Sequence, residues 1–221
     1  MKTMWITAAA VLGLVAAPAH AVPVTNGGFT YEFLDFSGDG AITPGASCGH
    51  VGQDYRCNEM HFAAGVGGDL AVTASRSVGD ALVYQNLPQW NGGLGVVAAG
   101  NPNQGKAVGA GEVLKLSFEN AVNLVGYHVY QVGGAPGADH FQVKVDGGDW
   151  QTRSFASVVF NQGHSDRWLT GKEFWFRSED RERFYLGAAK IMTAVPEPAS
   201  YALMLAGLAA VGFAARRRRQ G

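Results

Sequence analysis

The stretch Glu-Val-Leu-Lys-Leu-Ser-Phe at residues 112–118 decides the fold that this sequence predicts. Its apolar side chains, Leu114, Leu116 and Phe118, alternate with a lysine and a serine. Strict alternation is typical of a β-strand with one face against a core and the other toward solvent. We therefore expect the three apolar residues to be buried and the two polar residues to be exposed.

Similar short stretches recur along the chain between residues 22 and 194. The further strand candidates are residues 29–33, 70–74, 81–84, 94–97, 123–132, 141–145, 150–153, 173–176 and 184–186. Glycine-containing turns separate these stretches, and none keeps a 3.6-residue apolar period over three helical turns. The pattern predicts an all-β fold, a single antiparallel β-sandwich of the jelly-roll or lectin-like kind.

One hairpin is predicted in detail. Phe141, Val143 and Val145 alternate with polar residues, and the run Asp-Gly-Gly-Asp at 146–149 is a turn signal. Trp150 then begins the return strand of the hairpin.

Four tryptophans fall within the predicted domain: Trp90, Trp150, Trp168 and Trp175. Trp175 has a phenylalanine on either side, so it faces away from both, and a core position is the commoner fate of such a ring. Trp90 and Trp150 lie beside turns. Their indole rings are the candidates for stacking on sugar rings at the surface.

The charge balance speaks against a nucleic-acid partner. The 17 basic and 18 acidic residues give a formal net charge of −1. Without Lys2, the four arginines at 216–219 and Glu197, 12 basic and 17 acidic residues remain, a net charge of −5. A mildly acidic domain lacks the basic surface that binding to DNA or RNA requires.

The two cysteines, Cys48 and Cys57, predict a disulfide if the chain is exported to an oxidising compartment. A disulfide that closes the loop from residue 48 to residue 57 would stabilise the fold by roughly 2.5–3 kcal/mol in the chain-entropy model. The alternative is a metal site in which both cysteines join His50 and His61. That spacing lacks the paired C-x-x-C unit that is typical of zinc sites.

Calcium is the one cofactor that the sequence makes a candidate. The stretch from Asp35 begins like an EF-hand loop, but the twelfth position is Ala46 rather than an acid, and no helices flank it. A looser calcium site could use Asp35, Asp39, Glu112 and Asp139. The alternative is that such aspartates bond to backbone N–H groups of their own turns. Otherwise no cofactor is expected.

The first 21 residues have the pattern of a secretory signal peptide. Lys2 precedes an apolar run from Met4 to Ala16, and small residues at Ala19 and Ala21 predict cleavage before Val22. The alternative is a permanent N-terminal anchor, for which the apolar run is too short.

The last 27 residues combine a rigid motif, an apolar run and a cationic stop. Val195, Pro196, Glu197 and Pro198 hold the chain extended, because proline restricts its own backbone and that of the residue before it. Residues 199–215 carry no charge and would rise about 25 Å as a helix, the short end of a membrane span. Arg216, Arg217, Arg218 and Arg219 then mark the cytoplasmic side.

This tail resembles the PEP-CTERM sorting signal of Gram-negative bacteria, the substrate signal of the membrane protease/transpeptidase called exosortase. The Pro-Glu-Pro segment, the spanning run and the arginine cluster occur in the order of that family. The resemblance implies recognition at the motif, removal of the tail, and release or attachment at the cell surface. A plain C-terminal membrane anchor is the alternative. The predicted organisation is a signal peptide (1–21), a β-sandwich domain (22–194) and a sorting signal (195–221).

These observations predict an exported protein of the cell surface or extracellular matrix, and not an enzyme. Its expected partners are exosortase, the secretion translocon and, before processing, the inner membrane. No residue is assigned a catalytic role. Two alternatives remain: a lectin-like module that binds exopolysaccharide, and a hydrolase of matrix polymers, which needs two carboxylates that converge in a pocket.

Overall fold

The computed structural model describes residues 24–26, 29–37, 43–44, 48–51, 54–86, 92–100, 106–132, 140–154, 168–179, 182–194, 204 and 206–208. The structural statements below concern these residues. The predicted signal peptide, the Pro-Glu-Pro segment and the arginine cluster lie outside them. Within the described chain, no helix has the length and the apolar character needed to cross a membrane.

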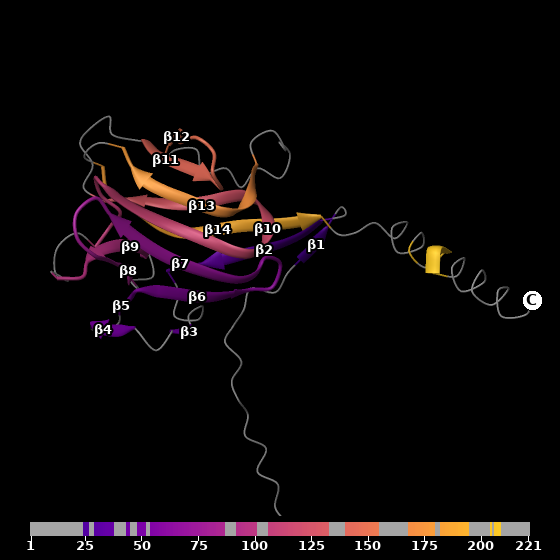
Figure 1. The fold of residues 1–221 in the computed structure, drawn as a ribbon, viewed down its shortest axis with the longest axis horizontal. Helices are drawn as coiled ribbons and strands as arrows, with labels where there is room; N and C mark the ends of the chain where they lie inside the picture. Colours follow the sequence, from indigo (N-terminus) through magenta and orange to yellow (C-terminus); the bar gives the residue numbers. More distant parts are fainter. Residues whose placement is uncertain are drawn as a thin grey trace, which may run out of the picture.

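The described residues form fourteen strands, and the predicted all-β fold is confirmed (Figure 1). The strands are β1 Val24–Asn26, β2 Phe29–Asp35, β3 Thr43–Pro44, β4 Gly49–Val51, β5 Asp54–Cys57, β6 Glu59–Ala64, β7 Gly68–Arg76, β8 Ala81–Asn86, β9 Gly93–Ala98, β10 Glu112–Gln131, β11 His140–Val145, β12 Gln151–Ser154, β13 Leu169–Ser178 and β14 Phe184–Ala194. Their described pairings are antiparallel.

Strand β10 is the longest and holds the sheet together. The sequence predicts two strands here, 113–118 and 123–132, whereas the structure has one strand of 20 residues with a register shift between Ser117 and Val122. Its first part pairs with β7 and β13. Its second part pairs with β14, and residues 122–124 still pair with β13. An irregularity of this kind lets one continuous strand change neighbours.

The strands that join β10 form a single hydrogen-bonded network. It runs in the order β12-β11-β13-β10-β14-β9-β8-β5-β4, with β7, β6 and β3 added through the first part of β10 and with β2 and β1 added through β14. One hydrophobic core includes side chains from both groups of strands. Ring pairs in this core join strands that are not hydrogen-bonded neighbours: Tyr127 and Phe141 are 5.4 Å apart, and Phe141 and Phe184 are 5.5 Å apart.

The alternation predicted around residue 114 is confirmed. Leu114, Leu116 and Phe118 are buried, and so are Phe141 and Val143 in β11. The predicted hairpin joins β11 to β12, although β12 begins one residue after Trp150.

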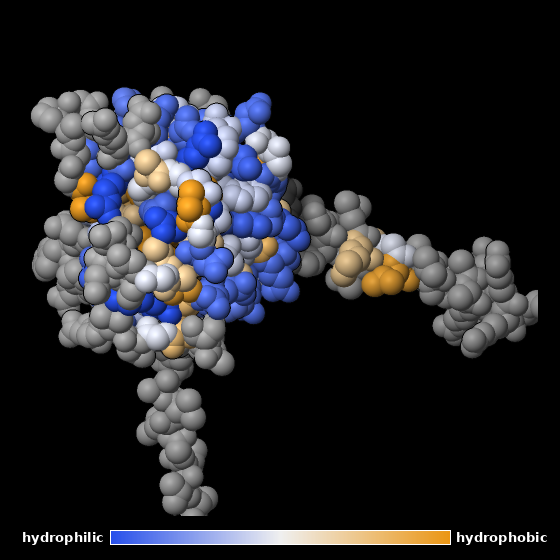
Figure 2. Space-filling view, turned by 60° about the vertical axis from the view of Figure 1, so that its left-hand side comes forward, coloured by the Kyte–Doolittle hydropathy of each residue, from blue (hydrophilic) through white to orange (hydrophobic). Residues whose placement is uncertain are grey.

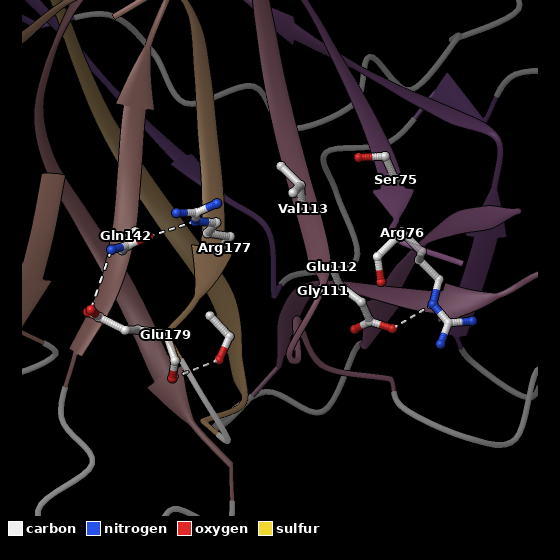
Figure 3. A pocket seen from close by; sticks show the side chains of 10 residues that line it. Ser75, Arg76, Gly111, Glu112, Val113, Gln142, Arg177 and Glu179 are labelled. Carbon is white, nitrogen blue, oxygen red and sulfur yellow. Dashed lines mark hydrogen bonds and ion pairs between the residues drawn. The ribbon is translucent and has the colours of Figure 1, made fainter. Parts of the chain in front are cut away.

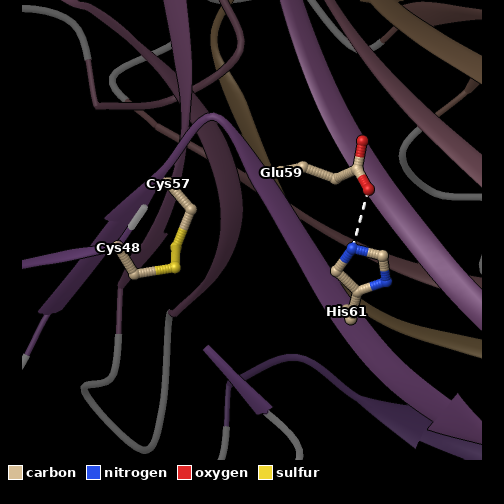
Figure 4. The surroundings of a disulfide bond; sticks show 4 residues. All are labelled: Cys48, Cys57, Glu59 and His61. Atoms are coloured by element: carbon tan, nitrogen blue, oxygen red, sulfur yellow. Dashed lines mark ion pairs between the residues drawn. A yellow bond between two sulfur atoms is a disulfide. The ribbon is translucent and has the colours of Figure 1, made fainter. Parts of the chain in front are cut away.

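The disulfide between Cys48 and Cys57 is present and joins the ends of the β4–β5 hairpin (Figure 4). Bonded sulfurs cannot act as thiolate ligands, so the four-ligand metal site is excluded in this state. His61 instead places its Nε2 atom 2.7 Å from Glu59 Oε1, with both side chains about half exposed.

Strand β2 turns its aromatic face outward. The alternation of Phe29, Tyr31 and Phe33 puts these rings on one side, and in the structure the other side, with Leu34, is buried. Phe33 is 42% exposed, whereas Glu32 is only 2% exposed. Alternation defines the two faces of a strand but not which of them meets the core.

The buried Glu32 carboxylate holds the turn between β6 and β7. It accepts hydrogen bonds from Gly65 N at 3.0 Å and Val66 N at 2.7 Å. A carboxylate that accepts two backbone N–H groups ties β2 to a distant turn more strongly than a neutral acceptor would.

We predict that Glu32→Ala lowers the free energy of unfolding by about 2–3 kcal/mol, because two backbone donors lose a charged acceptor. Urea denaturation of the protein purified from exporting cells measures this change. The matched control, Glu59→Ala, removes an exposed carboxylate and should change stability by less than about 0.5 kcal/mol. Equal effects of the two variants would contradict the role given to Glu32.

Candidate functional site

A pocket of about 580 Å³ opens at one end of the sheet (Figure 3). Strands β7, β10, β11 and β13, together with the residues that directly flank three of them, supply its lining: Ser75, Arg76, Ser77, Gly111, Glu112, Val113, Gln142, Arg177, Ser178 and Glu179. The register places Ser75 beside Val113, Val113 beside Arg177, and Arg177 beside Gln142. The pocket therefore rests on a row of neighbouring side chains across four strands. Its volume falls within the range of small-molecule sites.

A second row beside the pocket alternates cations with indole rings. The register puts Lys115 of β10 beside Trp175 of β13, and Trp175 beside Lys144 of β11. The Nζ atoms of Lys115 and Lys144 lie 5.0 and 4.6 Å from the Trp175 ring centroid. Trp150, just before β12, extends the row, with Lys144 Nζ at 5.1 Å from its ring centroid. We call Lys115, Trp175, Lys144 and Trp150 the indole–lysine row.

Arg177 links this row to the pocket. Its Cζ atom lies 4.1 Å from the Trp150 ring centroid, and the residue also lines the pocket. Its Nε donates to Gln142 Oε1 at 2.6 Å, which fixes the guanidinium group (Figure 3). Cation–π contacts of this kind contribute about 0.5–1 kcal/mol each at exposed sites. They also hold the indole rings in defined positions.

The carboxylate of Glu179 is held at the pocket by neutral donors. Gln142 Nε2 donates to Glu179 Oε1 at 3.4 Å, and Thr152 Oγ1 donates to Glu179 Oε2 at 3.2 Å. These bonds tie the end of β13 to β11 and β12.

Glu112 is the second carboxylate that lines the pocket. Arg76 Nε lies 2.9 Å from Glu112 Oε1, and Gly109 N donates to Glu112 Oε2 at 2.8 Å. Burial raises the pKa of Glu112 above its ordinary value, and the Gly109 hydrogen bond and Arg76 partly offset that effect. The pocket thus contains the two carboxylates that a hydrolase needs, and both are engaged by protein donors.

The charges of the indole–lysine row are unevenly compensated. Lys115 Nζ lies 2.6 Å from Glu173 Oε1. Ion pairs with carboxylates within the described residues otherwise involve His61, Arg76 and Lys106, and not Lys144 or Arg177. Lys144 and Arg177, which both lie near Trp150, therefore have no carboxylate within 4 Å among the described residues, and Gln142 lies between Arg177 and Glu179.

A separate polar cluster lies on strands β5 and β8. The Tyr84 hydroxyl donates to Asp54, and Lys106 Nζ lies 3.9 Å from the same carboxylate. Burial, followed by the Asp54 hydrogen bond, raises the pKa of Tyr84. Among the described residues, Nε and Nη2 of Arg56 are buried without a hydrogen-bond partner.

The structure places only some of the tryptophans that the sequence predicts for binding. Trp150 lies in the indole–lysine row, whereas Trp90 falls outside the described residues. The sequence predicts a core position for Trp175, because tryptophan side chains are more often buried. In the structure the ring instead faces outward, between two lysines. The prediction that Trp175 faces away from its two phenylalanine neighbours is confirmed, since both phenylalanines are buried. Identifying its lysine partners requires the strand register.

The calcium hypothesis stays a prediction. Asp35 accepts hydrogen bonds from the backbone N and the Oγ atom of Ser37, the local pattern that is the alternative to metal binding. Glu112 is engaged by Arg76, and Asp39 and Asp139 fall outside the described residues. In the part of the chain that the structure describes, no three acidic, histidine or cysteine side chains gather as metal ligands.

The described part of the tail is apolar and exposed. Residues 204 and 206–208 are helical, and Met204 and Leu208 are 60% and 63% exposed. Figure 2 shows the described surface of the domain in that view as largely hydrophilic, in contrast to these tail residues.

Residues 194–219 match the family model of the PEP-CTERM protein-sorting motif. No curated protein and no solved structure matches the chain. The chain thus carries the sorting motif that its tail predicts. The motif implies exosortase-dependent export, with transient membrane anchoring before a final place at the cell surface or outside the cell.

The titration of Glu112 makes the stability of the fold depend on pH. Because its folded pKa is raised, this group contributes stability below its unfolded pKa, and that contribution is lost as pH rises through the folded pKa. We predict that the stability of the natural protein minus that of Glu112→Gln falls between about pH 4 and pH 7. Urea denaturation of both proteins at the two pH values tests this; a constant or rising difference would contradict it.

Proposed function

We propose that this protein is a non-catalytic component of the bacterial cell surface or extracellular matrix that binds polysaccharide. The observation that carries the proposal is the indole–lysine row beside a pocket, in a chain whose sorting motif implies an extracellular place. The secretion translocon and the inner membrane are its partners during export, and exosortase is its processing enzyme.

The position of the sorting motif supports processing next to the folded domain. The motif begins at residue 194, which is also the last residue of β14, where Ala194 pairs with Phe29. The Pro-Glu-Pro segment thus follows the sheet directly in the sequence. The disulfide is consistent with export, because such bonds persist in oxidising compartments.

The finer fold that we propose is a β-sandwich. Its two layers would share β10, the first around β13 and β7 and the second around β14. The core ring pairs support this arrangement, since Tyr127 in the second part of β10 contacts Phe141 of β11. In a sandwich one side of each sheet is buried and the other faces solvent, which leaves the indole–lysine row open to a polymer.

The geometry of the row suits an extended sugar chain. Trp175 and Trp150 come from neighbouring parts of one sheet face and are held by cations rather than by a core. Indole rings offer large apolar surfaces at little conformational cost, and sugar rings have apolar C–H faces that can lie against them. Ser75 adds a hydroxyl group on the same face, whereas Gln142 and Thr152 are bonded to Arg177 and Glu179.

Catalysis is the weaker explanation of the pocket. A glycosidase needs one carboxylate free to protonate the leaving oxygen and another free to attack or to activate water. Glu112 is engaged by Arg76, and Glu179 is engaged by Thr152 and Gln142. Both carboxylates already serve the protein as acceptors.

Replacing Pro196, Glu197 and Pro198 by alanines tests the sorting role. We expect this variant to stay uncleaved in the membrane fraction, because the apolar run and the arginines are kept while the recognition segment is lost. A chain that ends at Ala194 should be exported without anchoring. Fractionation and mass spectrometry of the C-terminus report both. Normal tail removal in the alanine variant would contradict exosortase processing and favour a plain anchor.

Removing either indole ring tests polysaccharide binding. We expect Trp150→Ala and Trp175→Ala each to weaken retention on the host's own exopolysaccharide about tenfold, roughly 1.4 kcal/mol for a central aromatic contact. The matched control is Tyr31→Ala on β2, which removes another half-buried aromatic ring with a lysine Nζ at 4.9 Å from its centroid. Release of new reducing ends from the polymer, abolished by Glu112→Gln, would instead favour the hydrolase.

A further inference from the structure

We infer that the indole–lysine row and Arg177 select polysaccharides whose sugars carry carboxylate groups, such as uronic acids. This inference rests on the proposed binding of polysaccharide and names the class of sugar. Three cations, Lys115, Lys144 and Arg177, lie near the indole rings of this face, although the net charge of the domain is negative.

Two of these cations are available to an anionic ligand. Lys115 is compensated by Glu173 at 2.6 Å, whereas Lys144 and Arg177 have no carboxylate within 4 Å among the described residues. Both flank Trp150, at 5.1 and 4.1 Å from its ring centroid. An anion bound between them would compensate both charges while the sugar ring that carries it lies near the indole.

The guanidinium group of Arg177 is oriented for such an anion. Its Nε is engaged by Gln142 Oε1 at 2.6 Å, and this is its one hydrogen bond within the described residues. The two terminal nitrogens remain for a planar carboxylate, which arginine can bind through two parallel N–H···O bonds. Because Arg177 also lines the pocket, the carboxylate would direct its sugar toward that opening.

A neutral sugar fits this face less well. A neutral sugar ring bound here would leave the charges of Lys144 and Arg177 without a counter-charge. A carboxylated sugar can approach with the cations in place. Densely sulfated chains fit poorly as well, because the carboxylates of Glu112 and Glu179 at the pocket repel closely spaced negative charges.

The test uses polymers that share a backbone and differ in charge. Polygalacturonate and its fully methyl-esterified form are compared, with dextran sulfate as a non-carboxylate polyanion, using the protein purified from exporting cells. We expect polygalacturonate to bind at least about tenfold more tightly than either of the others, in a salt-dependent way.

Variants assign the effect to this face. Arg177→Gln and Lys144→Gln should each weaken polygalacturonate binding about tenfold, since each removes one of the two uncompensated cations. Lys190→Gln is the matched control, because Lys190 lies 4.9 Å from the Tyr31 ring on other strands and should leave binding unchanged. Unfolding midpoints of all three variants show whether the fold is kept. If Arg177→Gln unfolds, Lys144→Gln still decides the question.

The outcomes separate this inference from the proposed function. Equal binding of polygalacturonate and its methyl ester would overturn the carboxylate preference and leave polysaccharide binding in place. Equal binding of dextran sulfate would overturn it too, in favour of general electrostatic attraction. Retention on none of these polymers, nor on the host's own exopolysaccharide, would overturn the proposed function as well.

Discussion

The structure depends on backbone hydrogen bonding along both edges of β10. A strand of 20 residues would leave a long unpaired edge if its neighbours did not change along its length. The irregularity between Ser117 and Val122 makes that change, so that β7 gives way to β14 on one side of the strand. The β6–β7 turn is bonded to β10 at the same irregularity, where Asn120 N donates to Gly67 O at 2.9 Å. A Cβ atom on Gly67 would lie 2.6 Å from the Phe118 ring, so only glycine fits there. Since Glu32 holds the same turn, three distant segments meet at one point of the chain.

Local patterns in the sequence predicted what lies on one strand but not how strands meet. Alternation identified the buried side of β10 and β11 because a core requires apolar contacts at every second residue. Alternation predicted two strands in place of β10, because residues 119–121 are polar or small. These residues contact the β6–β7 turn, a contact that local sequence does not reveal. Alternation could not predict short strands such as β3 and β4, which are too short to show a pattern and are defined by their hydrogen bonds to neighbouring strands. For β2 it found two faces, and the buried one contains a glutamate, whose partners are more than 30 residues away.

The candidate site was less predictable than the fold for the same reason. Trp150 could be placed at the surface because a turn precedes it, but the cations near its ring, Lys144 and Arg177, come from two other strands. Trp175 could be oriented relative to Phe174 and Phe176, whereas only the register brings Lys115 and Lys144 to its two sides. The pocket combines residues from four strands, with Ser75 and Arg177 about 100 positions apart in the chain. The disulfide and the sorting tail were predictable because their chemistry is local or depends on the compartment.

The topology also separates the pocket from the sorting motif along β10. Antiparallel pairing places Met192 beside Asn123, so the sorting motif leaves the domain near the irregularity of β10. The pocket lies at the other end of the first part of that strand, beside Val113. Ten residues of strand separate Val113 from Asn123, which is roughly 33 Å along β10 at about 3.3 Å per residue. The proposed binding of polysaccharide and the processing of the tail would therefore use different ends of one sheet.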